Sequence, residues 1–206
     1  VMHDSNAYRT TGVDENIANM TYKEVRRLDA GSWYSDEYKG EKVPGLREVL
    51  ELAQGKIKLN IELKPADNGK ELARKTVALI EKYNMENECV ITSFSSSALS
   101  AAKSCDENIR VGYILSAAYG DYYDMKNIDF FSVNAAYLSK RTIDAIHNSG
   151  KQVYAWTVNN KDSIKNLTNK GVDGVITDNP VLARETIYSR DTSETIINMI
   201  RYVFNQ

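Results

Sequence analysis

From Lys56 onward, short apolar segments rich in β-branched residues alternate with segments that have the period of a helix. Their nearly continuous apolar character is typical of parallel strands that are covered on both faces. The alternation therefore predicts an α/β fold made of six βα units around a parallel sheet. The six strand candidates are residues 57–63, 89–93, 109–115, 128–134, 152–158 and 172–177.

The segments between these strands carry helix signals. Residues 70–83, 139–149 and 162–170 have apolar residues at helical spacing, which predicts helices with one buried face. Gly150 and Gly171 stand where a helix would end, and Pro180 stands where another would begin. No break in composition marks a second domain, so residues 1–206 are expected to form a single domain.

The two ends of the chain differ from this regular part. Residues 5–45 are polar and turn-rich, and their aromatic residues include Tyr8, Tyr22, Trp33, Tyr34 and Tyr38. Two interpretations remain for them, an insertion that forms a long active-site loop or a small subdomain packed on its own aromatic rings. Residues 191–206 place their apolar side chains on one helical face, which predicts a C-terminal helix packed on the domain; a role at a partner or membrane surface is the alternative.

Charge and composition limit the partners. The 206 residues include 26 basic and 28 acidic side chains, a formal net charge of −2, so no bulk field favours nucleic acid or an acidic membrane. No segment approaches the ~18 consecutive apolar residues of a membrane span. Cys89 and Cys105 lack metal-ligand spacing and are expected to be free thiols rather than a disulfide.

The two histidines of the chain differ in their surroundings. His147 comes late in a predicted helix, where a cation suits the helix dipole, and we interpret it as structural. His3 follows the apolar pair Val1 and Met2 and precedes Asp4, at what looks like a strand end. An imidazole in such a place is either a general acid or base or an ordinary surface residue.

Glu62 and Lys64 end the first predicted strand and share its face with Asn60. Barrel enzymes place their catalytic groups at the carboxyl ends of the strands. The pair is therefore either a buried ion pair or a metal-binding carboxylate beside a phosphate-binding lysine. Trp156 and Phe94, also near strand ends, would line the same site or fill the top layer of the barrel.

Eight strings in order resemble the glycerophosphodiester phosphodiesterase family, from the first residue to about residue 183. They are VMHD at 1–4, RTTG at 9–12, LDAGSW at 28–33, VPGLREVL at 43–50, LNIELK at 59–64, TSF at 92–94, AWTVN at 155–159 and GVDGVITDNP at 171–180. The resemblance implies a TIM (β/α)8-type barrel with a small insertion after its second strand. The six predicted strands would then be strands three to eight of an incomplete barrel.

The resemblance also implies chemistry. The family cleaves glycerophosphodiesters to glycerol 3-phosphate and an alcohol, using a divalent cation, Ca²⁺ or Mg²⁺, and two histidines as general acid and base. By motif position His3 corresponds to the second histidine, Glu62 to the third metal carboxylate and Lys64 to a phosphate contact. Trp156 would contact the substrate.

The chain also departs from the family pattern. The family's His-Arg-Gly motif and Glu-x-Asp pair do not occur here. We therefore expect an N-terminal truncation of two strands, an incomplete metal site, little activity, and oligomer formation through the open barrel edges. A membrane anchor upstream of Val1 and the cellular location stay open. The alternatives are a head-group binding module without catalysis and a related phospholipase barrel.

Overall fold

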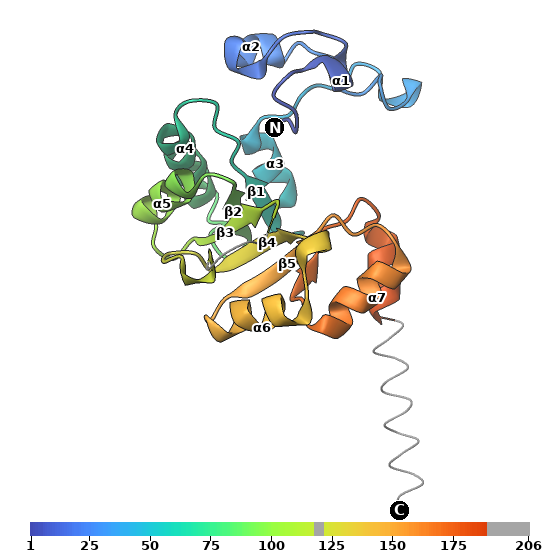
Figure 1. Cartoon of the computed structure of the whole chain (residues 1–206). Helices are drawn as coiled ribbons and strands as arrows, with labels where there is room; N and C mark the ends of the chain where they lie inside the picture. Colours follow the sequence, from blue (N-terminus) through green and yellow to red (C-terminus); the bar gives the residue numbers. More distant parts are fainter. Residues whose placement is uncertain (118–121, 189–206) are drawn as a thin grey trace, which may run out of the picture.

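A computed structural model describes residues 1–117 and 122–188, and its centre is one parallel sheet (Figure 1). Neighbours in the sequence are neighbours in the sheet, and every pair of strands is parallel. All six predicted strands are present, most of them shorter than predicted. The strands are β1 (Leu59–Glu62), β2 (Cys89–Ser93), β3 (Arg110–Leu115), β4 (Phe130–Asn134), β5 (Gln152–Trp156) and β6 (Gly174–Val175).

The sheet curls into a half-barrel, which confirms the predicted α/β class. Strands β1 and β6 lie at its two ends, and no strand in the described part of the chain joins them. An open sheet edge leaves backbone N–H and C=O groups without a strand partner. Oligomer formation through these edges stays a prediction.

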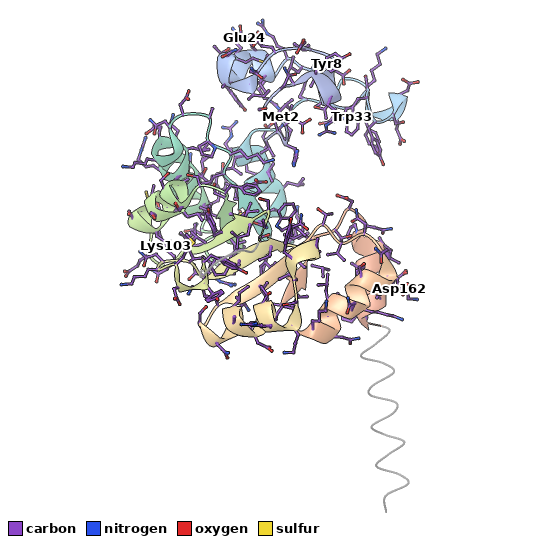
Figure 2. The ribbon with its side chains drawn as sticks, in the orientation of Figure 1. Met2, Tyr8, Glu24, Trp33, Lys103 and Asp162 are labelled. Carbon is purple, nitrogen blue, oxygen red and sulfur yellow. The ribbon has the colours of Figure 1, made fainter. Side chains whose placement is uncertain are left out.

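Helices cover the outer face of the sheet. Val111, Phe131 and Val153 alternate toward this face and are fully buried among helix side chains such as Leu99 and Ile146. Figure 2 labels Lys103 on one of these helices, at the left of the molecule, and Asp162 on another, at the right. The covering helices are α3 (Leu46–Ala53), α4 (Gly69–Lys82), α5 (Ser96–Cys105), α6 (Lys140–Asn148) and α7 (Lys161–Lys170).

The helix predictions are confirmed in part. The predicted helices at 70–83, 139–149 and 162–170 are α4, α6 and α7, and a further helix begins at Pro180 as predicted. The expectation of a helix after β3, in the third βα unit, is not met in the described residues between β3 and β4, which form only the 3-10 turn η3 (Tyr122–Asp124). The predicted C-terminal helix, 191–206, lies outside the described residues.

The inner face of the half-barrel is filled by aromatic rings. Phe130 is fully buried, and its ring centroid lies 4.8 Å from that of Tyr154. Gly112 faces Phe130 across the β3–β4 pair, and a Cβ at Gly112 would lie 2.1 Å from the ring. This packing therefore depends on a glycine in β3.

The N-terminal segment, residues 1–45, lies over one end of the sheet as a separate layer (Figure 1). It contains the short elements α1 (Tyr8–Thr11), η1 (Ile17–Asn19), α2 (Tyr22–Val25) and η2 (Asp36–Tyr38). The rings of Trp33, Tyr34 and Tyr38 contact one another but remain about half exposed or more, so they do not form a core. Among the described residues, no helix has the length and apolar character needed to cross a membrane.

Candidate active site

A cleft of about 1270 Å³ lies between the N-terminal segment and the carboxyl ends of β1 and β2. Most of its lining comes from residues 1–5, 16–20, 62–68 and 93–95. The last two stretches begin where β1 and β2 end, which is the edge where barrel enzymes hold their catalytic groups. His3, Glu62 and Lys64, the three polar candidates from the sequence, all line this cleft.

Lys64 connects the strand to the N-terminal segment. Its ammonium group lies 3.6 Å from Glu62 Oε2 and donates a hydrogen bond of 2.9 Å to the backbone oxygen of His3. The side chains of Lys64 and Glu62 are 39% and 29% exposed. The expected ion pair therefore exists, but it faces the cleft and is not buried. An ammonium group has three donors, so Lys64 retains capacity for an anion in the cleft.

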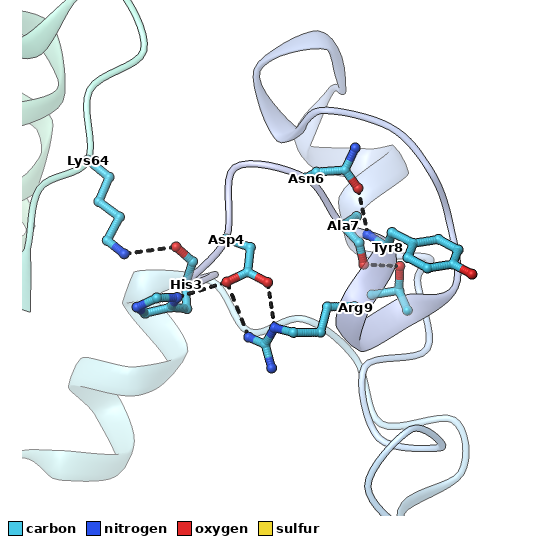
Figure 3. Close-up of polar contacts among 8 residues, drawn as sticks. His3, Asp4, Asn6, Ala7, Tyr8, Arg9 and Lys64 are labelled. Atoms are coloured by element: carbon cyan, nitrogen blue, oxygen red, sulfur yellow. Dashed lines mark hydrogen bonds and ion pairs between the residues drawn. The ribbon is translucent and has the colours of Figure 1, made fainter. Parts of the chain in front are cut away.

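The side chains of His3, Asp4 and Arg9 form a hydrogen-bonded series (Figure 3). His3 Nδ1 lies 2.8 Å from Asp4 Oδ1, and Arg9 donates to both oxygens of Asp4, from Nε at 2.5 Å and from Nη2 at 3.3 Å. The hydrogen bond from Arg9, followed by that from His3, lowers the pKa of Asp4 to about 2. The carboxylate is thus an acceptor at neutral pH, and Nδ1 of His3 carries the hydrogen that it accepts.

The local sequence presents Arg9 to Asp4. Asn6 Oδ1 accepts from the Tyr8 backbone N–H at 2.8 Å where the single-turn helix α1 begins. Gly12 ends α1 in the left-handed conformation, with φ of 73°, which a residue with a side chain rarely adopts. Ala7, the N-cap residue that precedes α1, is fully buried. Sequence reasoning gave Arg9 no role, although its RTTG string was a signal.

The aromatic candidates occupy two different positions. Phe94 lines the cleft and is 51% exposed, which agrees with the first of its two predicted roles. Trp156 is not among the lining residues; its Nε1 donates to the Ser132 backbone oxygen at 2.9 Å. Its ring contacts Phe94 edge to face, with 6.2 Å between centroids. Trp156 therefore supports a cleft residue, and a direct substrate contact by Trp156 stays a prediction.

The residues of the cleft do not fit a divalent cation by themselves. In residues 1–117 and 122–188, no group of three or more His, Cys, Asp or Glu side chains is arranged to hold a metal ion. Glu62 is paired with Lys64, and Asp4 is bound by Arg9 and His3. Since Ca²⁺ and Mg²⁺ gather six or more oxygen ligands, we derive no chemical step through a metal.

His147 does not line the cleft. Its Nε2 is 2.9 Å from Asp173 Oδ2, and the same oxygen accepts from the backbone N–H of Val153 at 2.8 Å. Val153 is near the start of β5, at the opposite end of the strands from the cleft. The contacts agree with the structural interpretation of His147.

The profile of the glycerophosphoryl diester phosphodiesterase family matches residues 1–182, nearly nine-tenths of the chain. The chain belongs to this family. The resemblance noted in the sequence is thereby confirmed, and the half-barrel is the family's fold in its coarse features.

Two similar proteins and two solved structures illustrate the relationship within the family. A glycerophosphodiester phosphodiesterase of Caldanaerobacter subterraneus is 28% identical over 98% of this chain and 79% of its own length. One of Bacillus subtilis is 28% identical over 88% and 69%. The Oleispira antarctica phosphodiesterase in complex with the product sn-glycerol-3-phosphate has a TM-score of 0.79 at 28% identity, over 90% of this chain and 78% of that one. A Parabacteroides distasonis enzyme with a TM-score of 0.80 is 21% identical, over 92% and 78%, and supports the fold alone.

Proposed function

We propose that the cleft binds a glycerophosphodiester and that His3 transfers a proton during its hydrolysis, in which the oxygen of a water molecule bonds to phosphorus as the alcohol leaves, giving glycerol 3-phosphate and the free alcohol. The observation that carries this proposal is the meeting of His3, Lys64 and Glu62 in one cleft at the carboxyl ends of β1 and β2. A similar structure holds the product sn-glycerol-3-phosphate, which supports the substrate class.

Three residues of the cleft would have separate roles in binding and cleavage. The ammonium group of Lys64 would lie against the phosphate and offset its negative charge, which increases as the bond to the leaving alcohol breaks. His3 would act through Nε2, because its Nδ1 is occupied by Asp4. Phe94 would cover the apolar side of the bound molecule.

The chain offers this machinery only in part. His3 is the single histidine of the cleft, and Glu62 is one carboxylate where a hard cation needs several oxygen ligands. We therefore propose that Glu62 contributes one ligand to a Ca²⁺ or Mg²⁺ ion, that these residues alone bind it weakly, and that turnover by the 206-residue chain is slow. The incomplete metal site also favours a second candidate, a head-group binding module without catalysis.

Calorimetry with sn-glycerol 3-phosphate tests the binding step. We expect the chain to bind it and Lys64→Met to lower the affinity by about tenfold or more, since a hydrogen bond between charged groups is lost. Lys75→Met is the matched control, because Lys75 is exposed on α4 and pairs with Glu71 outside the cleft. Absence of binding, or equal losses in the two variants, contradicts the proposal.

Turnover separates the two candidate functions. Glycerophosphocholine is incubated with the wild type and with His3→Ala, with and without added Ca²⁺ or Mg²⁺. Slow release of glycerol 3-phosphate that His3→Ala abolishes supports the enzyme. Binding of sn-glycerol 3-phosphate without any release supports the binding module.

A further inference from the structure

Arg9 is a charged residue of the N-terminal segment, in contact with a residue of the cleft, to which the proposed chemistry gives no role. It does not line the cleft, yet its guanidinium group is bound on both sides. On one side it holds both oxygens of Asp4, and on the other its central carbon lies 5.4 Å from the ring centroid of Trp33. The indole N–H of Trp33 in turn donates to the Ala30 backbone oxygen at 2.9 Å, which fixes the ring.

These contacts form one continuous chain from the N-terminal segment to the candidate catalytic group. Trp33 supports Arg9, Arg9 holds Asp4, and Asp4 accepts from Nδ1 of His3. Two donors on one carboxylate restrict its rotation, and a planar guanidinium fixes a carboxylate more firmly than a point charge would. The Lys64 bond to the His3 backbone oxygen restrains the same residue from the strand side.

We propose that Arg9 is a positioning residue, which holds Asp4 so that His3 keeps its hydrogen on Nδ1 and presents Nε2 for proton transfer. The catalytic role of Nε2 rests on the proposed function, whereas the tautomer follows from the contacts among His3, Asp4 and Arg9 alone. Without Arg9, the Asp4 side chain is free to turn toward solvent, because His3 is 76% exposed and offers it no enclosing site. The ratio of the two neutral tautomers of His3 would then approach that of a histidine in water.

The tautomer is measurable without any turnover. Nitrogen-15 NMR at about pH 9, above the range in which imidazole ordinarily titrates, separates Nδ1–H from Nε2–H rings. The chain has two histidines, so His147→Gln assigns the signals. His147 is an internal standard as well, because its Nε2 and not its Nδ1 faces a carboxylate.

We expect His3 of the wild type to be mainly the Nδ1–H form and His147 mainly the Nε2–H form. Arg9→Ala should lower the His3 ratio of Nδ1–H to Nε2–H by roughly fivefold, the value of one modest hydrogen bond. Asp4→Ala should lower the ratio at least as much. Arg9→Lys should restore part of it, because a lysine supplies charge without the planar pair of donors.

Arg74→Ala is the matched control, since Arg74 makes the same kind of exposed carboxylate contact, 3.0 Å to Glu71, away from the cleft. It should leave both histidine spectra unchanged. An Arg9→Ala spectrum with an unchanged His3 ratio overturns the proposal, and so does an equal change at His147, which would indicate general unfolding. If the ratio changes as expected while sn-glycerol 3-phosphate fails to bind the wild type, the positioning role stands and the proposed function fails.

Discussion

Replacing Gly112 by alanine tests how the inner face of the half-barrel is packed. A Cβ at Gly112 would lie 2.1 Å from Cε2 and 2.3 Å from Cζ of Phe130, whereas carbon atoms in contact are ordinarily 3.5–4.0 Å apart. The ring would have to move by more than 1 Å. Phe130 is fully buried against Tyr154 at 4.8 Å, so the ring has little room to move.

We expect Gly112→Ala to lower the free energy of unfolding by about 3 kcal/mol, the upper end of the usual cost of overpacking. Urea denaturation followed by tryptophan fluorescence measures this value. A second variant, Phe130→Leu, removes Cε2 and Cζ, the two ring atoms nearest to the new Cβ. In the Phe130→Leu background the cost of Gly112→Ala should fall below about 1 kcal/mol, since the two changes are coupled through one contact.

Two results would refute this reasoning. One is a cost for Gly112→Ala of less than about 0.5 kcal/mol in the wild-type background, which is the size of an ordinary surface change. The other is an equal cost in both backgrounds, which would mean that the glycine acts through the backbone and not through the Phe130 ring. Gly174→Ala is the milder comparison, because its Cβ would lie 3.2 Å from the Tyr154 ring.

Three further predictions concern thiols, acid and metal. Cys105 is exposed and should react with a thiol reagent within seconds to minutes at about pH 8, whereas Cys89, whose pKa burial raises to about 11, should react only on unfolding; two equally fast thiols would count against this. Hydrogen bonds from the backbone and hydroxyl of Ser32 and from other backbone N–H groups hold the pKa of Asp29 well below its usual range. Because the pKa of Asp29 is lowered in the folded state, the ionised carboxylate stabilises the fold above the unfolded pKa near 3.8, and this stabilisation is lost as the pH falls below that value. The difference in Tm between the wild type and Asp29→Asn should therefore shrink from neutral pH to about pH 2; a constant difference would argue against it. Addition of millimolar Ca²⁺ or Mg²⁺ should leave the Tm of the chain nearly unchanged, because Glu62 supplies one ligand and the described residues form no larger cluster of ligands, so the cation is bound weakly; a rise of several degrees would contradict this.

The regular part of the fold was predictable because its signals are local. Apolar runs with β-branched residues located every strand, and Gly150, Gly171 and Pro180 located three helix termini. The six βα units required a helix between β2 and β3, but the bounds of α5 were not predicted because Ser96–Cys105 is rich in serine, which favours turns in isolation; burial of the helix against α4 and the sheet supplies the stability. Propensity was overridden there by tertiary packing.

The candidate site was predictable at the strand ends and not beyond them. Glu62 and Lys64 follow from position on a strand, and His3 from its place after an apolar pair. The link from Arg9 to Asp4 depends on the left-handed turn at Gly12 and on the burial of Ala7, which no periodicity indicates. Irregular segments carry such contacts because their geometry is set by individual hydrogen bonds.

Histidine modification tests whether the cleft that holds His3 binds the phosphodiester. Diethyl pyrocarbonate is applied with and without sn-glycerol 3-phosphate, and mass spectrometry of peptides gives a separate rate for each histidine. The account predicts that sn-glycerol 3-phosphate slows modification of the exposed His3 severalfold and leaves that of His147 unchanged. An unchanged rate at His3, at a concentration that saturates binding, would contradict it.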